Sequence, residues 1–273
     1  FTTIATGGYS TKQASIAYWD SPFIQYIFII FMILAGVNFS LYYYTYKQKF
    51  TKVFTNEELK YYLITIAVFT ITVFFSIVDF KQINNLQKLE QSFREGIFQV
   101  TSIITTTGYT TVDYMKWIPV TWILLLLLML NGASAGSTTG GMKMVRIVIL
   151  FKYCYYEITK IIHPNAIIPV TYNNHALQLT VVNRVLAFVF VYLLIVALGI
   201  LILTANGVGL YESIGGVISS IGCVGPGLGN VGPAGNYAFL PDFSKWTLAF
   251  LMLLGRLEIF TVLLIFTPAF WKK

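Results

Sequence analysis

Long apolar stretches alternate with polar, glycine-containing segments along the whole chain. A stretch of about 20 apolar residues is the length that a helix needs to cross a hydrocarbon core about 30 Å thick. The pattern predicts an all-α integral membrane protein with four continuous spans and one broken span. The continuous spans are expected at 23–46, 59–80, 182–204 and 245–268, and the broken one across 118–160.

The polar interruptions share one local order, in which a short apolar helix runs into a loop centred on glycine. The helix expected at 92–106 leads into "TTTGYTTVD", and the one at 206–223 leads into "GCVGPGLGN". The N-terminal "ATGGYSTKQ" repeats the loop alone. Both helices are too short to cross a bilayer. The order span, short helix, loop, span therefore recurs, and it predicts units at 1–50, 51–165 and 166–273, the first of them incomplete.

Composition supports a membrane protein and excludes an ordinary soluble domain. The chain is 56% hydrophobic and 11% charged, with a mean hydropathy of +0.72. Its net charge of +7 could indicate a nucleic-acid partner, but the lysines cluster in loops on one side of alternating spans. By the positive-inside rule, this placement predicts a multi-pass protein with a cytoplasmic C-terminus and no nucleic-acid partner. Because the chain opens on Phe1 directly before a polar motif, we expect upstream sequence to be missing.

Polar loops at membrane depth are costly, which limits what the three loops can be. Unpaired backbone groups persist there only when they are buried in protein or line a watery path. Ordinary extramembrane turns would be rich in charge, Asn, Asp and Pro, whereas these loops are rich in Thr and Gly. A central glycine permits positive φ, so that successive carbonyls can face one way and replace the hydration shell of a monovalent cation. Helices that end at the loops would direct the negative C-terminal ends of their dipoles toward the pore, which also favours a cation. We therefore interpret the loops as the lining of a cation pore.

The core "TTGYT" is similar to the filter sequence of potassium channels. The wider layout resembles the TrkH-type membrane subunit of the Trk/Ktr potassium transporter family. Further matches are "NGASAGSTTGGMKMVRIVILFK", "HPNA" and "GRLEIFTVLLIFTPAFW", so that the resemblance covers nearly all of the chain. It implies four repeats of membrane helix, pore helix, filter loop and membrane helix, arranged pseudo-fourfold around one pore. This chain would carry the end of the second repeat and all of the third and fourth.

The resemblance implies that backbone carbonyls of the three loops coordinate potassium. The residues so assigned are Thr6, Gly7, Gly8, Tyr9, Thr106, Thr107, Gly108, Tyr109, Cys223, Val224, Gly225 and Pro226. The family often has Asn where this chain has Cys223, a change that a carbonyl site tolerates. The resemblance also implies a homodimer in a bacterial inner membrane, with a cytosolic nucleotide-binding regulatory subunit of the TrkA/KtrA type. Potassium is then the bound ion, and no organic cofactor is expected in this chain.

The broken span contains a second candidate site. Residues 121–130 supply about 15 Å of helix, half a bilayer, before the small-residue loop 131–143. This loop resembles a phosphate-binding motif, but Met142 stands where the lysine belongs and no strand precedes the loop. Small residues let a loop fold across a pore and still move, and the family resemblance implies the same, so we predict a gate. Its expected residues are Gly132, Gly136, Ser137, Thr138, Thr139, Gly140, Gly141, Lys143 and Arg256.

Arg256 is expected in the middle of a span, where an arginine costs free energy unless a partner compensates its charge. We expect it to contact the carbonyls of the loop. The alternative is an ion pair with Glu258, but residues two apart do not share a helix face.

These features favour potassium uptake through a gated, channel-like pore. The alternative is a secondary transporter of a different cation or small solute, coupled to proton or sodium and also built on broken helices. Coupling usually needs an intramembrane carboxylate, and Glu258 is the only acid expected deep in a span. A membrane enzyme is a third possibility. Because the spans carry no cluster of His, Asp, Glu or Cys with catalytic spacing, we expect no enzymatic activity.

Overall fold

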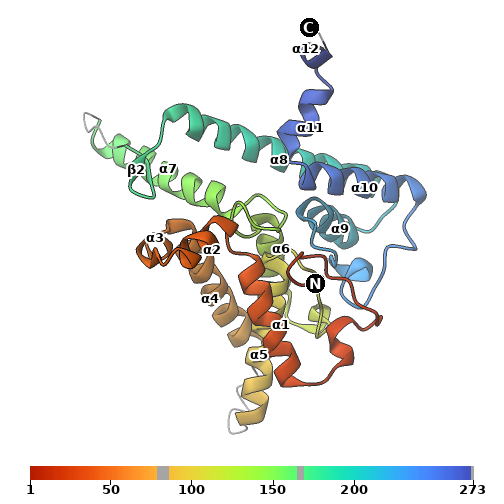
Figure 1. The fold of residues 1–273 in the computed structure, drawn as a ribbon. Coiled ribbons are helices and arrows are strands. Elements are labelled where there is room, and N and C mark those ends of the chain that lie inside the picture. The colour runs from red at the N-terminus through yellow and green to blue at the C-terminus, as the bar shows by residue number, and fades with distance from the viewer. Residues whose placement is uncertain (79–85, 165–168, 272–273) are drawn as a thin grey trace.

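The computed structural model describes residues 1–78, 86–164 and 169–271, and it is almost entirely helical (Figure 1). The α-helices are α1 (Pro22–Ala35), α2 (Phe39–Tyr46), α3 (Phe50–Phe54), α4 (Glu57–Ile77), α5 (Leu86–Ile104), α6 (Pro119–Asn131), α7 (Met144–Ile162), α8 (Leu179–Ala205), α9 (Leu210–Gly222), α10 (Asp242–Arg256), α11 (Ile259–Ile265) and α12 (Pro268–Trp271). Short 3-10 turns are η1 (Ser15–Tyr18), η3 (Tyr114–Lys116) and η4 (Gly229–Val231). A small antiparallel hairpin joins β1 (Thr171–Tyr172) to β2 (His175–Ala176). The predicted all-α class is confirmed.

Helices α5 and α9 lie at the centres of two groups of packed helices. α5 contacts α1, α4 and α6, and α9 contacts α6, α8 and α10. Because neighbours surround them, even their polar residues are buried, and Thr101 and Ser219 are both 0% exposed. A Cβ at Gly255 of α10 would lie 1.9 Å from the Ile221 carbonyl oxygen of α9, so only glycine allows this approach. These are the two short helices predicted before glycine loops, although α5 begins at Leu86, earlier than expected.

The two uninterrupted spans are α4 and α8. By length and apolar composition, they are the helices in the described part of the chain that could each cross a membrane alone. They agree with the spans predicted at 59–80 and 182–204, except that residues 79–80 lie outside the described residues. In Figure 1, α8 runs beside α7 on one side of the molecule, and α11 and α12 extend away from the rest.

The spans predicted at 23–46 and 245–268 are wrong as continuous helices. α1 and α2 meet at 94°, and α10 and α11 meet at 110°. At the first break the Asn38 side chain caps α2 by accepting a hydrogen bond from the backbone N–H of Ser40 (2.8 Å). At the second, Glu258 has a φ of +61°, which a right-handed helix cannot contain. With the predicted break between α6 and α7, three of the apolar stretches are interrupted rather than one.

Candidate functional site

The three glycine-centred loops adopt one backbone conformation. The first and third residues of each loop have positive φ: Thr6 (+50°) with Gly8 (+63°), Thr106 (+52°) with Gly108 (+80°), and Cys223 (+56°) with Gly225 (+113°). The residues between them do not. This alternation turns neighbouring carbonyls toward one side, unlike a strand, in which they alternate. The sequence predicts the glycine positions, whereas the left-handed Thr and Cys are visible only in the structure.

Where two neighbouring loops meet, a glycine of one loop packs against a backbone carbonyl of the next. A Cβ at Gly8 would lie 1.9 Å from the Thr107 carbonyl oxygen, and a Cβ at Gly108 would lie 2.0 Å from the Val224 carbonyl oxygen. Both distances are far below any allowed contact, so the absence of a side chain is what lets the loops approach. At Gly225 a Cβ would meet nothing within 4 Å. The structure therefore brings the three predicted filter loops side by side in chain order.

Some carbonyls of the predicted filter already accept hydrogen bonds from the protein. Ser102 Oγ donates to the Tyr109 carbonyl (2.6 Å), and the Tyr237 hydroxyl donates to the Gly225 carbonyl (2.7 Å). Burial raises the pKa of Tyr237 to about 12, so that its hydroxyl remains a donor at neutral pH. Within the described residues, no donor contacts the carbonyls of Thr107 and Val224.

The two filter tyrosines have different surroundings. Tyr109 is 2% exposed and packs edge-to-face on Phe28 of α1, with ring centroids 5.2 Å apart. Its hydroxyl also contacts the Thr2 hydroxyl. Tyr9 holds the same position in its own loop but is 80% exposed. Tyr109 therefore packs outward and holds its loop against α1, whereas Tyr9 does not.

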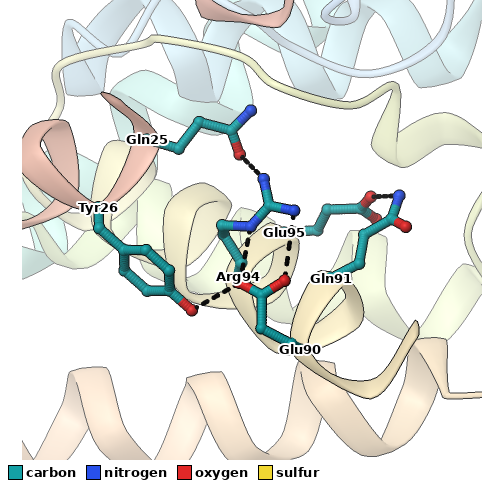
Figure 2. Close-up of polar contacts among 6 residues, drawn as sticks. All are labelled: Gln25, Tyr26, Glu90, Gln91, Arg94 and Glu95. Atoms are coloured by element: carbon teal, nitrogen blue, oxygen red, sulfur yellow. Dashed lines mark hydrogen bonds and ion pairs between the residues drawn. The ribbon is translucent and has the colours of Figure 1, made fainter. Parts of the chain in front are cut away.

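A polar cluster built on the buried residues Arg94 and Gln25 joins the helix before the second loop to the helix after the first (Figure 2). The Arg94 guanidinium of α5 donates to Gln25 Oε1 of α1 (2.6 Å) and to Glu90 Oε1 (2.9 Å). The Tyr26 hydroxyl reaches the same Glu90 oxygen (3.0 Å). Arg94 lies within the helix predicted at 92–106, but its burial is visible only in the structure, where the residue is 7% exposed.

The predicted gating loop lies directly against the filter loops. Thr6 Oγ1 donates to the Thr138 carbonyl (2.9 Å), and Thr106 Oγ1 accepts a hydrogen bond from the backbone N–H of Gly140 (2.8 Å). Arg256 donates to the same Thr138 carbonyl (2.7 Å), which is the contact expected for it. The side chains of two filter residues and one arginine therefore hold the middle of this loop.

The remaining gate residues shape the loop itself. Gly132 ends α6 with a φ of +68°, and Gly136, at +70°, accepts a hydrogen bond from the backbone N–H of Phe39 (3.0 Å). The hydroxyls of Ser137 and Thr139 share a hydrogen bond (2.7 Å). The loop then turns at Gly141, which has a φ of +75°, and the Lys143 ammonium donates to the Thr139 carbonyl. All the predicted gate residues thus belong to one folded loop and the helix end beside it.

Two acidic residues lie beside the gating loop. Glu258 stands at the break between α10 and α11, and its side chain is 54% exposed and pairs with Arg146 (2.9 Å). Glu58, which the sequence analysis overlooked, is only 3% exposed, and its Oε1 accepts a hydrogen bond from the Ala135 N–H of the gating loop (2.6 Å). The signal available in the sequence was weak, since an acid in the first turn of a helix usually stabilises that turn.

A cavity of about 420 Å³ opens beyond the filter loops. Its lining comes from the segments that follow the three loops, and it includes Gln13, Thr110, Asp113 and Gly235. The Asp113 carboxylate accepts a hydrogen bond from the backbone N–H of Met115 (3.2 Å) and so fixes the start of η3. An acidic side chain at this cavity would attract cations toward the filter loops.

Comparisons with known proteins agree along the entire chain. A family model described as a cation transport protein, TrkH, matches residues 1–273. The Trk system potassium uptake protein TrkH of Salmonella typhimurium is 36% identical over 275 residues, which cover 100% of this chain and 56% of that protein. The Trk system potassium uptake protein TrkG of Escherichia coli is 31% identical, over 99% of this chain and 55% of that protein.

The crystal structure of the potassium transporter TrkH from Vibrio parahaemolyticus has a similar fold. It superposes with a TM-score of 0.91 at 32% identity, over 99% of this chain and 57% of that one. The chain therefore spans a little more than half the length of the curated relatives that it matches.

Proposed function

The chain belongs to the TrkH family of cation transport proteins, and from this premise we propose that it forms part of a gated, channel-like pore for potassium uptake. The observation that carries the proposal is the set of three loops with one alternating backbone conformation, packed glycine against carbonyl. Such a set can offer a ring of carbonyl oxygens to a dehydrated monovalent cation. The relatives bear the name of potassium uptake proteins.

Coordination rests on carbonyls rather than on side chains. The best candidates are those of Thr107 and Val224, because each points at the glycine of the preceding loop and none of the described donors engages it. The carbonyls of Tyr109 and Gly225 bond to hydroxyl groups of the protein and contribute less. The hydroxyl of Thr106 and the thiol of Cys223 point away, toward Gly140 and toward the Met252 carbonyl. Replacement of Asn by Cys at position 223 is therefore tolerable.

The three loops belong to three successive units of a pseudo-fourfold pore, with boundaries at 1–50, 51–165 and 166–273. Two gaps in the packing support a further unit between the third loop and the first. Among the described residues, nothing lies within 4 Å of a Cβ built at Gly225, although the equivalent position in each other loop meets a carbonyl of the next loop. Tyr9 lacks the helix that Tyr109 finds in α1. A first repeat would fill both places.

We assign closure of the pore to the loop 131–143. It lies against the filter and is held there by Thr6, Thr106 and Arg256, so that in this position it blocks the path. Passive flow through an open gate suffices for accumulation, because one positive charge gains about 2.3 kcal/mol per 100 mV on moving inward. That free energy corresponds to about fifty-fold accumulation.

The protein is assigned to the bacterial inner membrane as a homodimer with a cytosolic nucleotide-binding regulatory subunit. The clustered lysines place the C-terminus in the cytoplasm by the positive-inside rule. Exposed apolar residues of α7, among them Phe151, Tyr155 and Ile158, suit contact with lipid or with a second copy of the chain.

The test is uptake of radioactive rubidium into liposomes that contain the full-length protein, with potassium or sodium as competitor. Potassium should compete well and sodium poorly. Gly108→Ser should reduce this preference at least tenfold, because its Cβ would meet the Val224 carbonyl at 2.0 Å.

Gly207→Ser is the matched control for that substitution. Gly207 has nearly the same φ, +79°, but a Cβ there would meet nothing within 4 Å. Backbone strain is therefore similar in the two variants, and only Gly108→Ser obstructs a filter carbonyl. Absence of rubidium uptake by the unmodified protein, or an equal loss of preference in both variants, would contradict the proposal.

A further inference from the structure

Glu58 is a buried carboxylate that is not required to stabilise the start of its own helix. It lies in the first turn of α4, where acids commonly stabilise a helix start. That helix is already capped by Asn56, whose side chain accepts a hydrogen bond from the backbone N–H of Leu59 (2.9 Å). The Glu58 side chain turns inward instead, and the residue is 3% exposed. A different part of the molecule must therefore account for its burial.

The partners of Glu58 come from the gating loop and from the segments beside it. Its Oε1 accepts a hydrogen bond from the Ala135 N–H at 2.6 Å, the length of a charge-assisted bond. The Val145 N–H at the start of α7 and the Tyr172 hydroxyl of β1 also face the carboxylate and favour its charged form. The described ion pairs do not include Glu58, so these donors together compensate for the removal of its charge from water.

The neighbouring acid has a separate set of partners. Glu57 pairs with Lys152 of α7 at 2.5 Å, and Lys152 also donates to the Thr171 carbonyl. The backbone N–H of Glu57 donates to Asn173 Oδ1 (2.8 Å). Glu57 thus fastens α4 to α7 and to the β1–β2 hairpin without touching the gating loop. Two adjacent carboxylates therefore bind different parts of the molecule.

The gating loop is held at two points. Its middle is fixed from the filter side by Thr106 and Arg256, as described above. Its beginning is fixed by Glu58 at Ala135 and by the Gly36 carbonyl, which accepts a hydrogen bond from the Ser134 N–H (3.1 Å). Of the contacts that the described residues make at the beginning of the loop, only that of Glu58 involves a charged group. A charged group gives the stronger hydrogen bond and leaves the larger penalty when it is removed.

We propose that Glu58 is a positioning residue of the gate, whose carboxylate holds the Ala135 end of the loop and thereby keeps the loop beneath the filter. This inference rests on the proposed function, because it takes the position of the loop in the structure to be the closed one. Loss of the carboxylate weakens the closed position without touching the filter loops. Flux in the resting state should rise, whereas the preference for potassium over sodium should stay the same.

The experiment compares Glu58→Gln with Glu57→Gln in the full-length protein. Glutamine keeps the shape of residue 58 and one acceptor, but its NH₂ group cannot accept hydrogen bonds from the remaining donors. Initial rubidium uptake would be measured in liposomes without nucleotide or partner protein. Glu58→Gln should raise this rate about tenfold, as expected for the loss of one charge-assisted hydrogen bond. Glu57→Gln should change it by less than about twofold, because the contacts of Glu57 are to α7 and the β1–β2 hairpin and not to the gating loop.

Thermal unfolding of each purified variant separates a loosened gate from a misfolded protein. If Glu58→Gln fails to fold, Glu58→Asp carries the test, because it retains the charge and shortens the reach by one methylene. A folded Glu58→Asp with raised uptake supports the proposal. Unmodified protein that takes up no rubidium would refute the proposed function. If the unmodified protein takes up rubidium, and the folded Glu58 variants take it up at the same rate or more slowly, the role of Glu58 is refuted but the proposed function is not. A rise of equal size in Glu57→Gln would also refute it.

Discussion

Thr6 and Thr106 each join the filter to the gating loop within one residue. Both have positive φ, a conformation that β-branched residues rarely adopt. Each also places its hydroxyl in a hydrogen bond with the loop below, Thr6 with Thr138 and Thr106 with Gly140. The unfavourable backbone conformation is thus offset by contacts that only a hydroxyl can make. The position of the loop 131–143 is therefore linked to the backbone of the loops that contain Thr6 and Thr106.

This coupling predicts a leak in Thr106→Val. Valine keeps the branched shape but cannot accept the hydrogen bond from the Gly140 N–H, and an unpaired buried amide costs about 1–3 kcal/mol. The closed position should lose that free energy, so resting rubidium uptake should rise about fivefold or more. Thr72→Val is the control, because the Thr72 hydroxyl is exposed and bonds only to carbonyls of its own helix. Equal rates in the two variants would argue against the coupling.

Three apolar stretches of the described chain are interrupted, which is the main feature of the fold at the level of helices. The breaks lie between α1 and α2, between α6 and α7, and between α10 and α11. Residues at the outer two breaks touch the loop of the middle one. The Phe39 N–H donates to the Gly136 carbonyl, and Arg256 donates to the Thr138 carbonyl. The three interruptions therefore meet around the gating loop.

Hydropathy predicted the helices better than their breaks. The break in 118–160 was predictable, because ten consecutive Gly, Ala, Ser and Thr residues at 132–141 interrupt the apolar run. The other two breaks occupy only two or three residues, and the apolar composition continues across them. Asn38, a good cap inside an apolar run, and Glu258 were the available signals. The burial of Glu58 and Arg94 was not predictable, since it depends on which helices pack against theirs.

The cluster around Arg94 predicts unequal effects of two ion pairs. Arg94→Met removes the cation from a pair whose arginine side chain is 9% exposed, and it also leaves buried Gln25 without its donor. Lys245→Met removes the cation from a pair whose side chains are 41% and 92% exposed. The first variant should lower the free energy of unfolding by about 2 kcal/mol or more. The second should lower it by about 0–1 kcal/mol.

Denaturant unfolding of both variants in the same detergent would measure the difference. Because Arg94 joins α5 to α1, its loss should also reduce the preference for potassium, whereas Lys245→Met should leave that preference unchanged. Similar destabilisation by the two substitutions would mean that the cluster does not join these helices.

Charge is distributed over the whole molecule in a way that suits cation entry from one side. The segments beyond the filter loops enclose a cavity of about 420 Å³ with Asp113 on its lining. Arg256 and Lys143 lie at the opposite end of the filter, where both donate to carbonyls of the gating loop. In the proposed pore, a cation approaching through this cavity would meet the Asp113 carboxylate before the carbonyls, and the charges of Arg256 and Lys143 after them. This polarity would favour a high local cation concentration at the cavity.

Asp113→Asn tests this distribution, because asparagine can still accept the hydrogen bond from the Met115 N–H and so preserves η3. The change removes charge and little else. At an ionic strength of about 0.01 M, where the Debye length is about 30 Å, the apparent KM for rubidium should rise about two- to threefold. At about 1 M, where the Debye length is about 3 Å, the variant and the unmodified protein should have the same apparent KM. Asp242→Asn, which alters a 92% exposed acid outside the cavity lining, should leave KM unchanged. If the effect of Asp113→Asn persisted at high salt, its cause would be a local change in structure, and the cavity would not concentrate cations through this charge.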